Sequence, residues 1–179
     1  MRNRRNEIYN ELLVIKCKQG DDEAFDELVG LWQKRLWHYA LRVTGSESSA
    51  WDVLQETWYA VIKGLSRLEN VAAFPAWIFR ILNNKCNDWL RKQQRRTKLR
   101  NDLEQQSQNN SDCADNEKTD FLNTAIAKLS ADCRALLMLR YREDFDISQI
   151  AEVLNIPEGT VKSRLHRTIE KLRQLMERN

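Results

Sequence analysis

The stretch from Asp146 to Leu172 constrains the fold most, because its residue order predicts two helices joined by a tight turn. Asp146 is suited to cap the first helix, and Gln149 three residues later is placed to complete a capping box. Asn155 fits the left-handed position that ends a helix, and Pro157 fits the start of the next one. The stretch is therefore expected to form a helix-turn-helix.

The second of these helices has one apolar side and one basic, polar side. Its apolar residues recur at spacings of four, four and three: Val161, Leu165, Ile169 and Leu172. The side chains that point away from this stripe are Lys162, Ser163, His166 and Arg167. Such a face suits a DNA major groove, although many helical hairpins carry exposed cations simply as a solvated surface.

Composition favours helices throughout the chain. Its 179 residues contain only five glycines and two prolines, and no segment shows the regular alternation of a strand. A hydrophobic content of 42% is enough for one or two compact domains. No apolar run approaches membrane-spanning length, and the N-terminus leads into an amphipathic helix instead of a signal peptide. We therefore expect a soluble, cytoplasmic, all-α protein.

The sequence predicts no metal site, no cofactor and no catalytic residues. The four cysteines are widely spaced, without a C-x-x-C pair or a nearby pair of histidines: Cys17, Cys86, Cys113 and Cys133. The two histidines, His38 and His166, lie far apart in the chain, and neither has a convincing Cys or Ser partner. Reduced thiols with structural roles are the default expectation.

A net charge of +3 conceals two basic blocks that flank an acidic segment. Residues 80–100 carry the first block, residues 101–120 are acidic, and the chain is basic again from Thr160. The acidic segment is also polar and poor in aromatics, which is typical of a flexible linker. We therefore predict two small helical domains, at residues 5–97 and 120–177, joined by a flexible acidic linker at 98–119.

The N-terminal half is predicted to form several amphipathic helices. Within residues 7–19, the stripe of Ile8, Leu12 and Ile15, with Leu13 as a further candidate, is expected to be the buried side. The helix over residues 51–65 has a larger apolar face: Val53, Leu54, Trp58, Val61, Ile62 and Leu65. The opposite face of that helix carries Asp52, Gln55 and Glu56, which form either plain surface or a docking patch. Residues 66–73 are predicted to be a loop, and another helix starts at Phe74-Pro75-Ala76-Trp77.

These segments, in this order, resemble the extracytoplasmic-function (ECF) sigma factors of the sigma-70 family, which keep sigma regions 2 and 4 joined by a linker. Over residues 20–91, the stretches that carry the resemblance are Gly20–Leu28, Asp52–Trp58, Phe74–Ile81 and Asn87–Arg91. In the C-terminal half the matching stretch is Gly159–Arg167. One departure is Trp51, where the family usually has an acidic residue just before Asp52.

The resemblance implies a function for each half of the chain. Region 2, over residues 5–97, would dock on RNA polymerase through Asp52, Gln55 and Glu56, and would melt and recognise the promoter's minus-ten element. The residues assigned to that element are Asn70, Arg80, Asn83, Asn84, Lys85 and Arg91. Region 4, over residues 120–177, would recognise the minus-thirty-five element. The residues assigned there are Thr160, Lys162, Ser163, Arg164, His166 and Arg167.

The partners implied are core RNA polymerase, through its β′ clamp helices and β flap, and promoter DNA. An anti-sigma factor, often membrane-anchored in this family, is implied as well, whereas no small-molecule substrate is expected. Three alternatives use the same residues differently: a helix-turn-helix regulator with a sensor domain, an enzyme, or an RNA-binding adaptor. The first would need a ligand pocket or phosphoacceptor site in the N-terminal half, and the sequence offers no sign of strands around which to build one.

Overall fold

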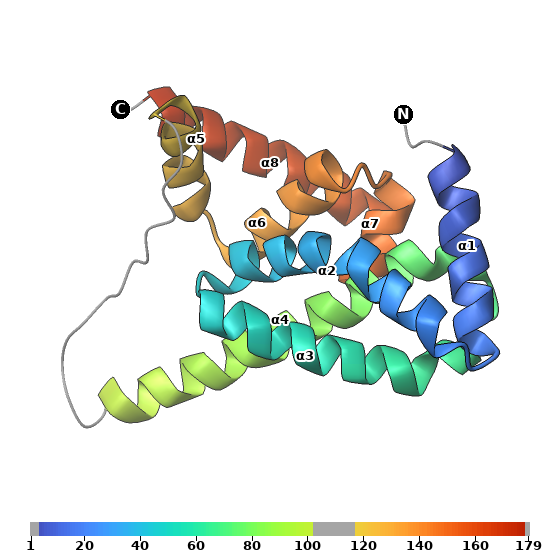
Figure 1. The fold of residues 1–179 in the computed structure, drawn as a ribbon. Helices are drawn as coiled ribbons and strands as arrows, with labels where there is room; N and C mark the ends of the chain where they lie inside the picture. The colour runs from blue at the N-terminus through green and yellow to red at the C-terminus, as the bar shows by residue number, and fades with distance from the viewer. Residues whose placement is uncertain (1–3, 102–116, 178–179) are drawn as a thin grey trace.

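The structure is a computed structural model that describes residues 4–101 and 117–177, and within those ranges all regular structure is helical (Figure 1). The eight α-helices are α1 (Arg4–Lys18), α2 (Asp22–Thr44), α3 (Glu47–Gly64), α4 (Phe74–Asn101), α5 (Glu117–Ala127), α6 (Ala131–Leu137), α7 (Ile147–Leu154) and α8 (Glu158–Glu177). Three short turns join them: 3₁₀ turns η1 (Leu65–Arg67) and η2 (Val71–Ala73), and a π-helical turn η3 (Met138–Arg142). The predicted all-α class is confirmed.

The predicted linker is mostly outside the described residues. Helix α4 continues to Asn101 and α5 begins at Glu117, so both helices enter the range 98–119 that the sequence assigned to the linker. The predicted flexibility falls on residues 102–116, of which the structure gives no description. The domain boundaries therefore stay predictions.

Short polar caps set where the N-terminal helices α2 and α3 begin. Asp21 accepts the Ala24 N–H at 2.9 Å at the start of α2, and Ser46 accepts the Ser49 N–H at the start of α3. Between them Gly45 takes the left-handed conformation, at φ 75°, that closes α2. The connection is so short that α2 and α3 pack side by side.

Helix α2 carries the central part of the core. Its buried side chains include Leu28, Trp32, Leu36 and Tyr39, and it packs against α1, α3 and α4. Trp32 meets Phe79 of α4 edge to face, with ring centroids 6.3 Å apart. Trp32 belongs to this core, at 4% exposed, whereas Trp51 on α3 is 47% exposed.

The predicted inner side of α1 is wrong for three of its four residues. Ile8, Leu12 and Ile15 are exposed, whereas Leu13 is buried as predicted and Val14 is buried beside it. Apolar residues point in almost every direction around this helix, so their periodicity does not select a face. A tertiary contact decides which side of α1 is buried. Asn10 lies on the buried side, and its Oδ1 accepts the Trp32 Nε1–H at 2.7 Å.

The C-terminal helices form the predicted helix-turn-helix. Asp146 and Gln149 make both hydrogen bonds of a capping box at the start of α7, and Asn155 ends that helix in the left-handed conformation at φ 52°. The carbonyl of Pro157, just before α8, accepts the N–H groups of the next turn. Val161 on α8 is buried, as its stripe predicts.

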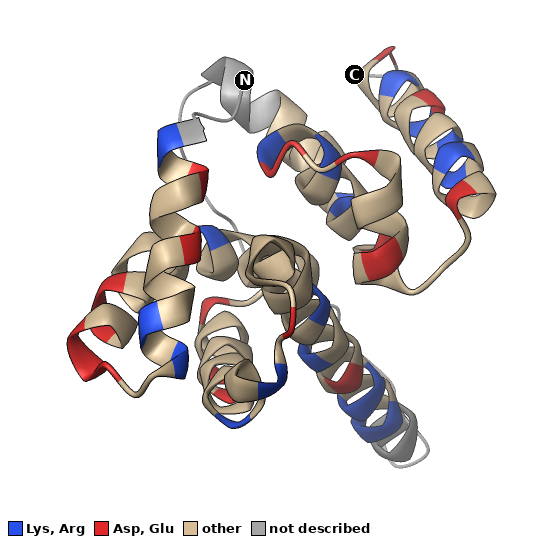
Figure 2. Ribbon diagram, turned by 90° about the vertical axis from the view of Figure 1, so that its right-hand side faces the viewer, with Lys and Arg blue, Asp and Glu red and all other residues tan. Residues whose placement is uncertain are grey.

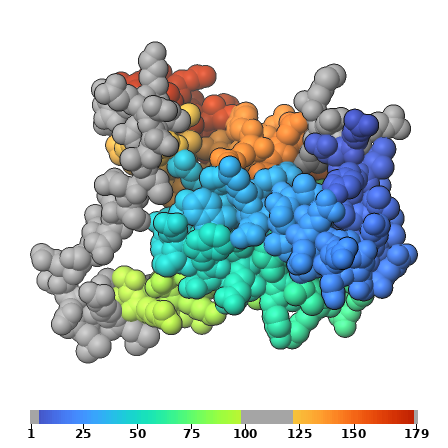
Figure 3. Space-filling model, in the orientation of Figure 1, coloured from blue at the N-terminus to red at the C-terminus, as the bar shows by residue number. Residues whose placement is uncertain are grey.

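The C-terminal helices lie against the N-terminal ones. Figure 3 shows the orange and red segments resting on the light-blue α2. Helix α6 packs on α2, and α7 packs on α4. Phe145, just before α7, is fully buried and meets Phe79 of α4 edge to face at 5.4 Å between ring centroids.

We expect Asp146→Ala to destabilise the C-terminal helices by about 1 kcal/mol, because the Gln149 N–H loses the acceptor that caps α7. Urea denaturation followed by helical circular dichroism measures the change. Glu152→Ala, at an exposed position later in the same helix, is the matched control and is expected to shift stability by less than about 0.5 kcal/mol. Equal stability of the Asp146→Ala and Glu152→Ala variants would contradict the capping role.

Candidate protein and nucleic-acid interfaces

Helix α3 brings the predicted docking residues together on one exposed face. Asp52, Gln55 and Glu56 are all exposed, while Val53 and Val61 on the other side of the helix are buried. Capping by Ser46 sets where this helix begins and therefore which residues face outward. The result is a small acidic and amide-bearing patch that is open to a partner.

Apolar side chains extend this patch along the helix. Trp51, Tyr59 and Ile62 are 47%, 61% and 60% exposed, and with Gln55 they follow each other at spacings of four, four and three. The prediction that Ile62 lies on the inner face is wrong, because Val61 takes the buried position beside it. We call this set the α3 surface: Trp51, Asp52, Gln55, Glu56, Tyr59 and Ile62. Clustered exposed apolar residues mark protein contact sites.

The α3 surface borders a groove that runs between α3 and α4. The groove has a volume of about 320 Å³, and its lining combines carboxylates of α3 with cations of α4: Asp52, Gln55, Glu56, Trp89, Lys92, Gln93 and Arg96. Glu56 also pairs with Lys85 of α4 at 3.2 Å. Both partners are partly exposed, so the pair is worth only about 0–1 kcal/mol. A partner's cation can replace Lys85 at little cost.

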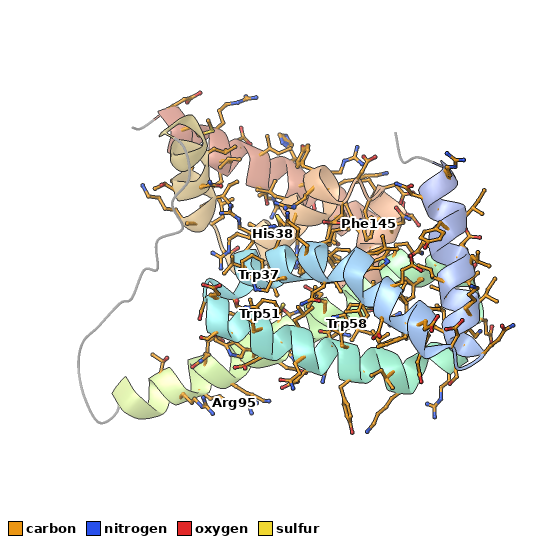
Figure 4. The ribbon with its side chains drawn as sticks, in the orientation of Figure 1. Trp37, His38, Trp51, Trp58, Arg95 and Phe145 are labelled. Atoms are coloured by element: carbon orange, nitrogen blue, oxygen red, sulfur yellow. The ribbon has the colours of Figure 1, made fainter. Side chains whose placement is uncertain are left out.

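Trp51 is held in place by an aromatic contact with α2. Its ring lies 5.9 Å from that of Trp37, which in turn lies 5.1 Å from the His38 ring (Figure 4). Burial lowers the pKa of His38, and the nearby positive charges of Arg142, Lys34 and Arg42 lower it further. The position where the sequence departs from the family pattern is thus packed against the neighbouring helix.

The segment before α4 is more ordered than the predicted loop, since it contains turns η1 and η2. Asn70 is exposed, and its Oδ1 accepts the Ala72 N–H at 3.1 Å, which caps η2. The side chain is therefore fixed at the entrance to α4.

The residues of α4 that were assigned to the minus-ten element do not share one environment: some are exposed, one faces α3, and one is buried. Arg80, Asn84 and Arg91 are exposed and share one face of the helix. Lys85 points instead toward α3, where it pairs with Glu56. Figure 2 shows the dense line of Lys and Arg along the second half of this helix.

Asn83 lies in the interior instead of on that face. It is 4% exposed, and its Oδ1 accepts the Tyr39 hydroxyl at 2.9 Å. The spacing of neighbouring residues indicates this buried position. Asn83 follows Phe79 by four residues and precedes Cys86 by three, and all three side chains are buried. An apolar stripe with one amide in it is easily taken for a polar face.

Helix α8 displays the residues assigned to the minus-thirty-five element. The side chains at its outer faces are exposed: Lys162, Ser163, Arg164, His166 and Arg167. Thr160 is half-buried, and its carbonyl accepts the Ser163 hydroxyl at 3.1 Å. The capped turn before α8 fixes which of these side chains face outward.

The two sets of assigned DNA contacts meet at one pocket between the N-terminal and C-terminal helices. Asn83 and Asn87 of α4 line one side, and Arg164 and Arg167 of α8 line another. The pocket has a volume of about 270 Å³, and Leu136 is among its apolar lining residues. Residues distant in sequence are thus brought within one small space.

Other site types find little support. Within the described ranges, no three His, Cys, Asp or Glu side chains are grouped so that they could hold a metal ion. Burial raises the pKa of the Cys86 thiol to about 12, so Cys86 is unreactive at neutral pH. Among the described helices, none is long and apolar enough to cross a membrane.

Two family models match the chain, one described as Sigma-70 region 2 over residues 28–96 and one described as Sigma-70, region 4 over residues 122–172. The ECF RNA polymerase sigma factor SigL of Mycobacterium tuberculosis is 34% identical over 148 residues, which cover 77% of this chain and 80% of SigL. The ECF RNA polymerase sigma factor SigW of Bacillus subtilis is 28% identical over 174 residues, covering 90% and 93% of the two chains.

Solved structures with the same fold include two protein complexes. The sigma factor RpoE in complex with the anti-sigma factor NepR, from Bartonella quintana, aligns with a TM-score of 0.69 at 24% identity, covering 86% of this chain and 96% of the solved one. CnrH in complex with the cytosolic domain of CnrY aligns with a TM-score of 0.69 at 22% identity, covering 95% and 98%.

Proposed function

Because this chain belongs to the ECF sigma factors of the sigma-70 family, we propose that it binds core RNA polymerase and directs it to promoters. Proteins of this family are transcription initiation factors and not enzymes. The observation that carries the proposal is that one chain combines a solvent-facing α3 surface with a basic helix, α8, behind a capped turn. The first suits a protein partner and the second suits DNA.

The α3 surface is the proposed docking site for the β′ clamp helices of the polymerase. Its carboxylates at Asp52 and Glu56 suit a basic partner, and its apolar side chains at Tyr59 and Ile62 give a contact that charge alone would not. The C-terminal helices are proposed to meet the β flap. Tethering both halves to the polymerase raises their effective concentration at the promoter, so that two modest DNA contacts act as one specific contact.

The minus-ten element is proposed to be melted and held at the start of α4. Asn70, Arg80 and Asn84 lie at or beyond the fixed turn η2, where amide and guanidinium groups are placed to contact an unpaired base and its phosphates. Lys85 and Arg91 are proposed to add phosphate contacts further along the helix. Asn83 contributes only if its bond to Tyr39 breaks, so its proposed contact depends on rearrangement.

The minus-thirty-five element is proposed to be recognised by α8 in the major groove. Arg164 and Arg167 are the side chains with bidentate reach to guanine, while Thr160, Lys162, Ser163 and His166 are placed for phosphates and other base edges. Sequence preference would then come from different chemistry at the two elements. The protein would contact unpaired bases at the minus-ten element and base edges in the major groove at the minus-thirty-five element.

An anti-sigma factor is proposed as the inhibitor of this chain. The support is that one solved structure with this fold, RpoE of Bartonella quintana, is a sigma factor in complex with the anti-sigma factor NepR. A membrane-anchored inhibitor, with the sigma factor itself in the cytoplasm beside the polymerase, fits this proposal. In vitro transcription with purified core polymerase on a promoter library tests the whole proposal, and absence of both initiation and core binding would reject it.

We expect Gln55→Ala combined with Glu56→Ala to weaken core polymerase binding about ten-fold, because the double change removes both the charge and the amide of the proposed contact and a ten-fold loss corresponds to about 1.4 kcal/mol. Ile62→Asp is expected to do the same by placing a charge in the apolar part of the α3 surface. Biolayer interferometry with immobilised core enzyme measures both. Glu11→Ala on α1, away from this surface, is the control, and unchanged affinity in the first two variants would show that docking lies elsewhere.

Arg164→Ala and Arg167→Ala are each expected to reduce recognition of the minus-thirty-five element roughly 5- to 150-fold, which corresponds to about 1–3 kcal/mol for a bidentate base contact. Core binding should stay at the wild-type level. Transcription from promoters with and without an intact upstream element separates the two effects. If the arginine variants lose core affinity instead, α8 serves the polymerase and not the DNA.

A further inference from the structure

The pocket of about 270 Å³ that α4 and α8 share contains side chains that the proposed function does not use. Asn87 of α4, Cys133 of α6 and Lys171 of α8 all line it, and none of the three is assigned to a promoter element or to the polymerase. Helix α6 packs on both α2 and α8, so it lies between α8 and the N-terminal helices (Figure 1). The pocket is therefore enclosed by several helices and is not a groove along a single one.

Helix α8 gives this pocket a positively charged side. Arg164, Arg167 and Lys171 follow each other at spacings of three and four, so they share one face of the helix, and all three are exposed. Within the described ranges, none of them forms an ion pair. Asp132 is the only carboxylate among the described lining residues, so cations outnumber it three to one. Unpaired cations gathered on one side of a pocket favour an anionic ligand.

Helix α4 gives the pocket two amides on another side. Asn83 is 4% exposed, and its Oδ1 accepts the Tyr39 hydroxyl at 2.9 Å, which fixes the side chain and leaves the amide nitrogen as a donor. Asn87 follows four residues later and is half-buried, and across the described residues its amide has no hydrogen-bond partner. Two positioned amides can hydrogen-bond to the polar edge of a ligand.

The rest of the lining is largely apolar. Ala135 and Leu136 of α6 are buried at 2% and 1% exposed, and Leu154 of α7 joins them in the lining. An apolar surface suits the face of a flat ring, which loses little when it leaves water. The pocket thus combines a site for negative charge, a site for a polar edge and a site for a ring.

We propose that this pocket binds a small molecule that joins a phosphate group to a heterocyclic ring, which is the chemistry of a nucleoside monophosphate. Arg164, Arg167 and Lys171 hold the phosphate through charge-assisted hydrogen bonds. The amides of Asn83 and Asn87 bind the polar edge of the base, as amide side chains do in other base contacts. A volume near the lower end of the ~300–1,000 Å³ that is typical of ligand sites favours one ring and one phosphate over a larger ligand.

A bound nucleotide has a consequence for promoter recognition. Its phosphate occupies Arg164 and Arg167, which are the side chains proposed to contact guanine in the minus-thirty-five element. Ligand and DNA therefore compete, and each lowers the affinity for the other by the same factor. This consequence rests on the proposed DNA role of α8, whereas the binding site itself does not.

Isothermal titration calorimetry on the full chain tests the site directly. The probes are the four common ribonucleoside monophosphates, the matching nucleosides and inorganic phosphate. At least one nucleotide is expected to bind about ten-fold or more tightly than its nucleoside and than inorganic phosphate, because each of these makes only part of the contacts. Failure of all four nucleotides to bind more tightly than inorganic phosphate overturns the proposal.

Two variants separate the phosphate contact from the base contact without changing any proposed DNA contact. Lys171→Gln is expected to weaken binding of the nucleotide about ten-fold, because one charge-assisted hydrogen bond is lost. Asn87→Leu is expected to weaken it about five-fold and to leave binding of inorganic phosphate unchanged. Arg173→Gln is the matched control, since it makes the same charge change on the opposite face of α8. Equal losses in Lys171→Gln and Arg173→Gln would mean that only the overall charge matters, which overturns the site.

Alkylation of Cys133 gives a readout that does not depend on affinity. This thiol lines the pocket and is half-buried, and Cys17 on α1 is half-buried far from it in sequence. A saturating concentration of the tightest nucleotide should slow the reaction of Cys133 with iodoacetamide several-fold, as followed by peptide mass spectrometry, and should leave the rate at Cys17 unchanged. An unchanged rate at Cys133 contradicts binding in this pocket. Neither readout uses DNA or polymerase, so a failed ligand site and a failed sigma function give different results.

Discussion

Burial of helix α2 is the constraint on which the rest of the structure depends. Its apolar residues recur often enough to face α1, α3 and α4 at once, and α6 then packs on what remains. Trp32 shows how this works, since it fills space against two aromatic rings of α4 while its Nε1–H is satisfied by Asn10 of α1. Because α2 is shared, the orientation of every neighbouring helix is fixed relative to one axis, and so are the faces that remain outside.

Function follows from what this packing leaves exposed. Helix α3 packs one side on α2 and exposes the other, which is the proposed docking side, and α8 likewise exposes the side that is proposed to bind DNA. The charges are segregated along the chain, so a modest total of +3 coexists with a strongly basic second half of α4. The proposed protein-docking surface and the proposed DNA-binding surfaces thereby lie on different helices.

Local features of this chain were predictable from the sequence, and features that depend on a distant partner were not. The caps at Asp21, Ser46 and Asp146 are fixed by neighbours in sequence, so the helix-turn-helix and the all-α class followed from the pattern. The buried side of α1 and the exposure of Ile62 depend instead on which apolar face meets α2. Asn83 is drawn inward by Tyr39, forty-four residues away, and the Glu143–Phe145 turn is drawn in by Arg35 and Phe79. No periodicity within one helix contains that information.

The exposed apolar part of the α3 surface has a consequence for how much of this protein stays usable in a cell. Tyr59 and Ile62 are exposed in this chain, and exposed apolar patches favour self-association. Any partner that binds the folded chain also stabilises it by mass action. If the α3 surface binds a partner as proposed, the amount of usable factor depends on the concentration of that partner as well as on synthesis of the chain, and chains in excess of the partner are the most prone to aggregate.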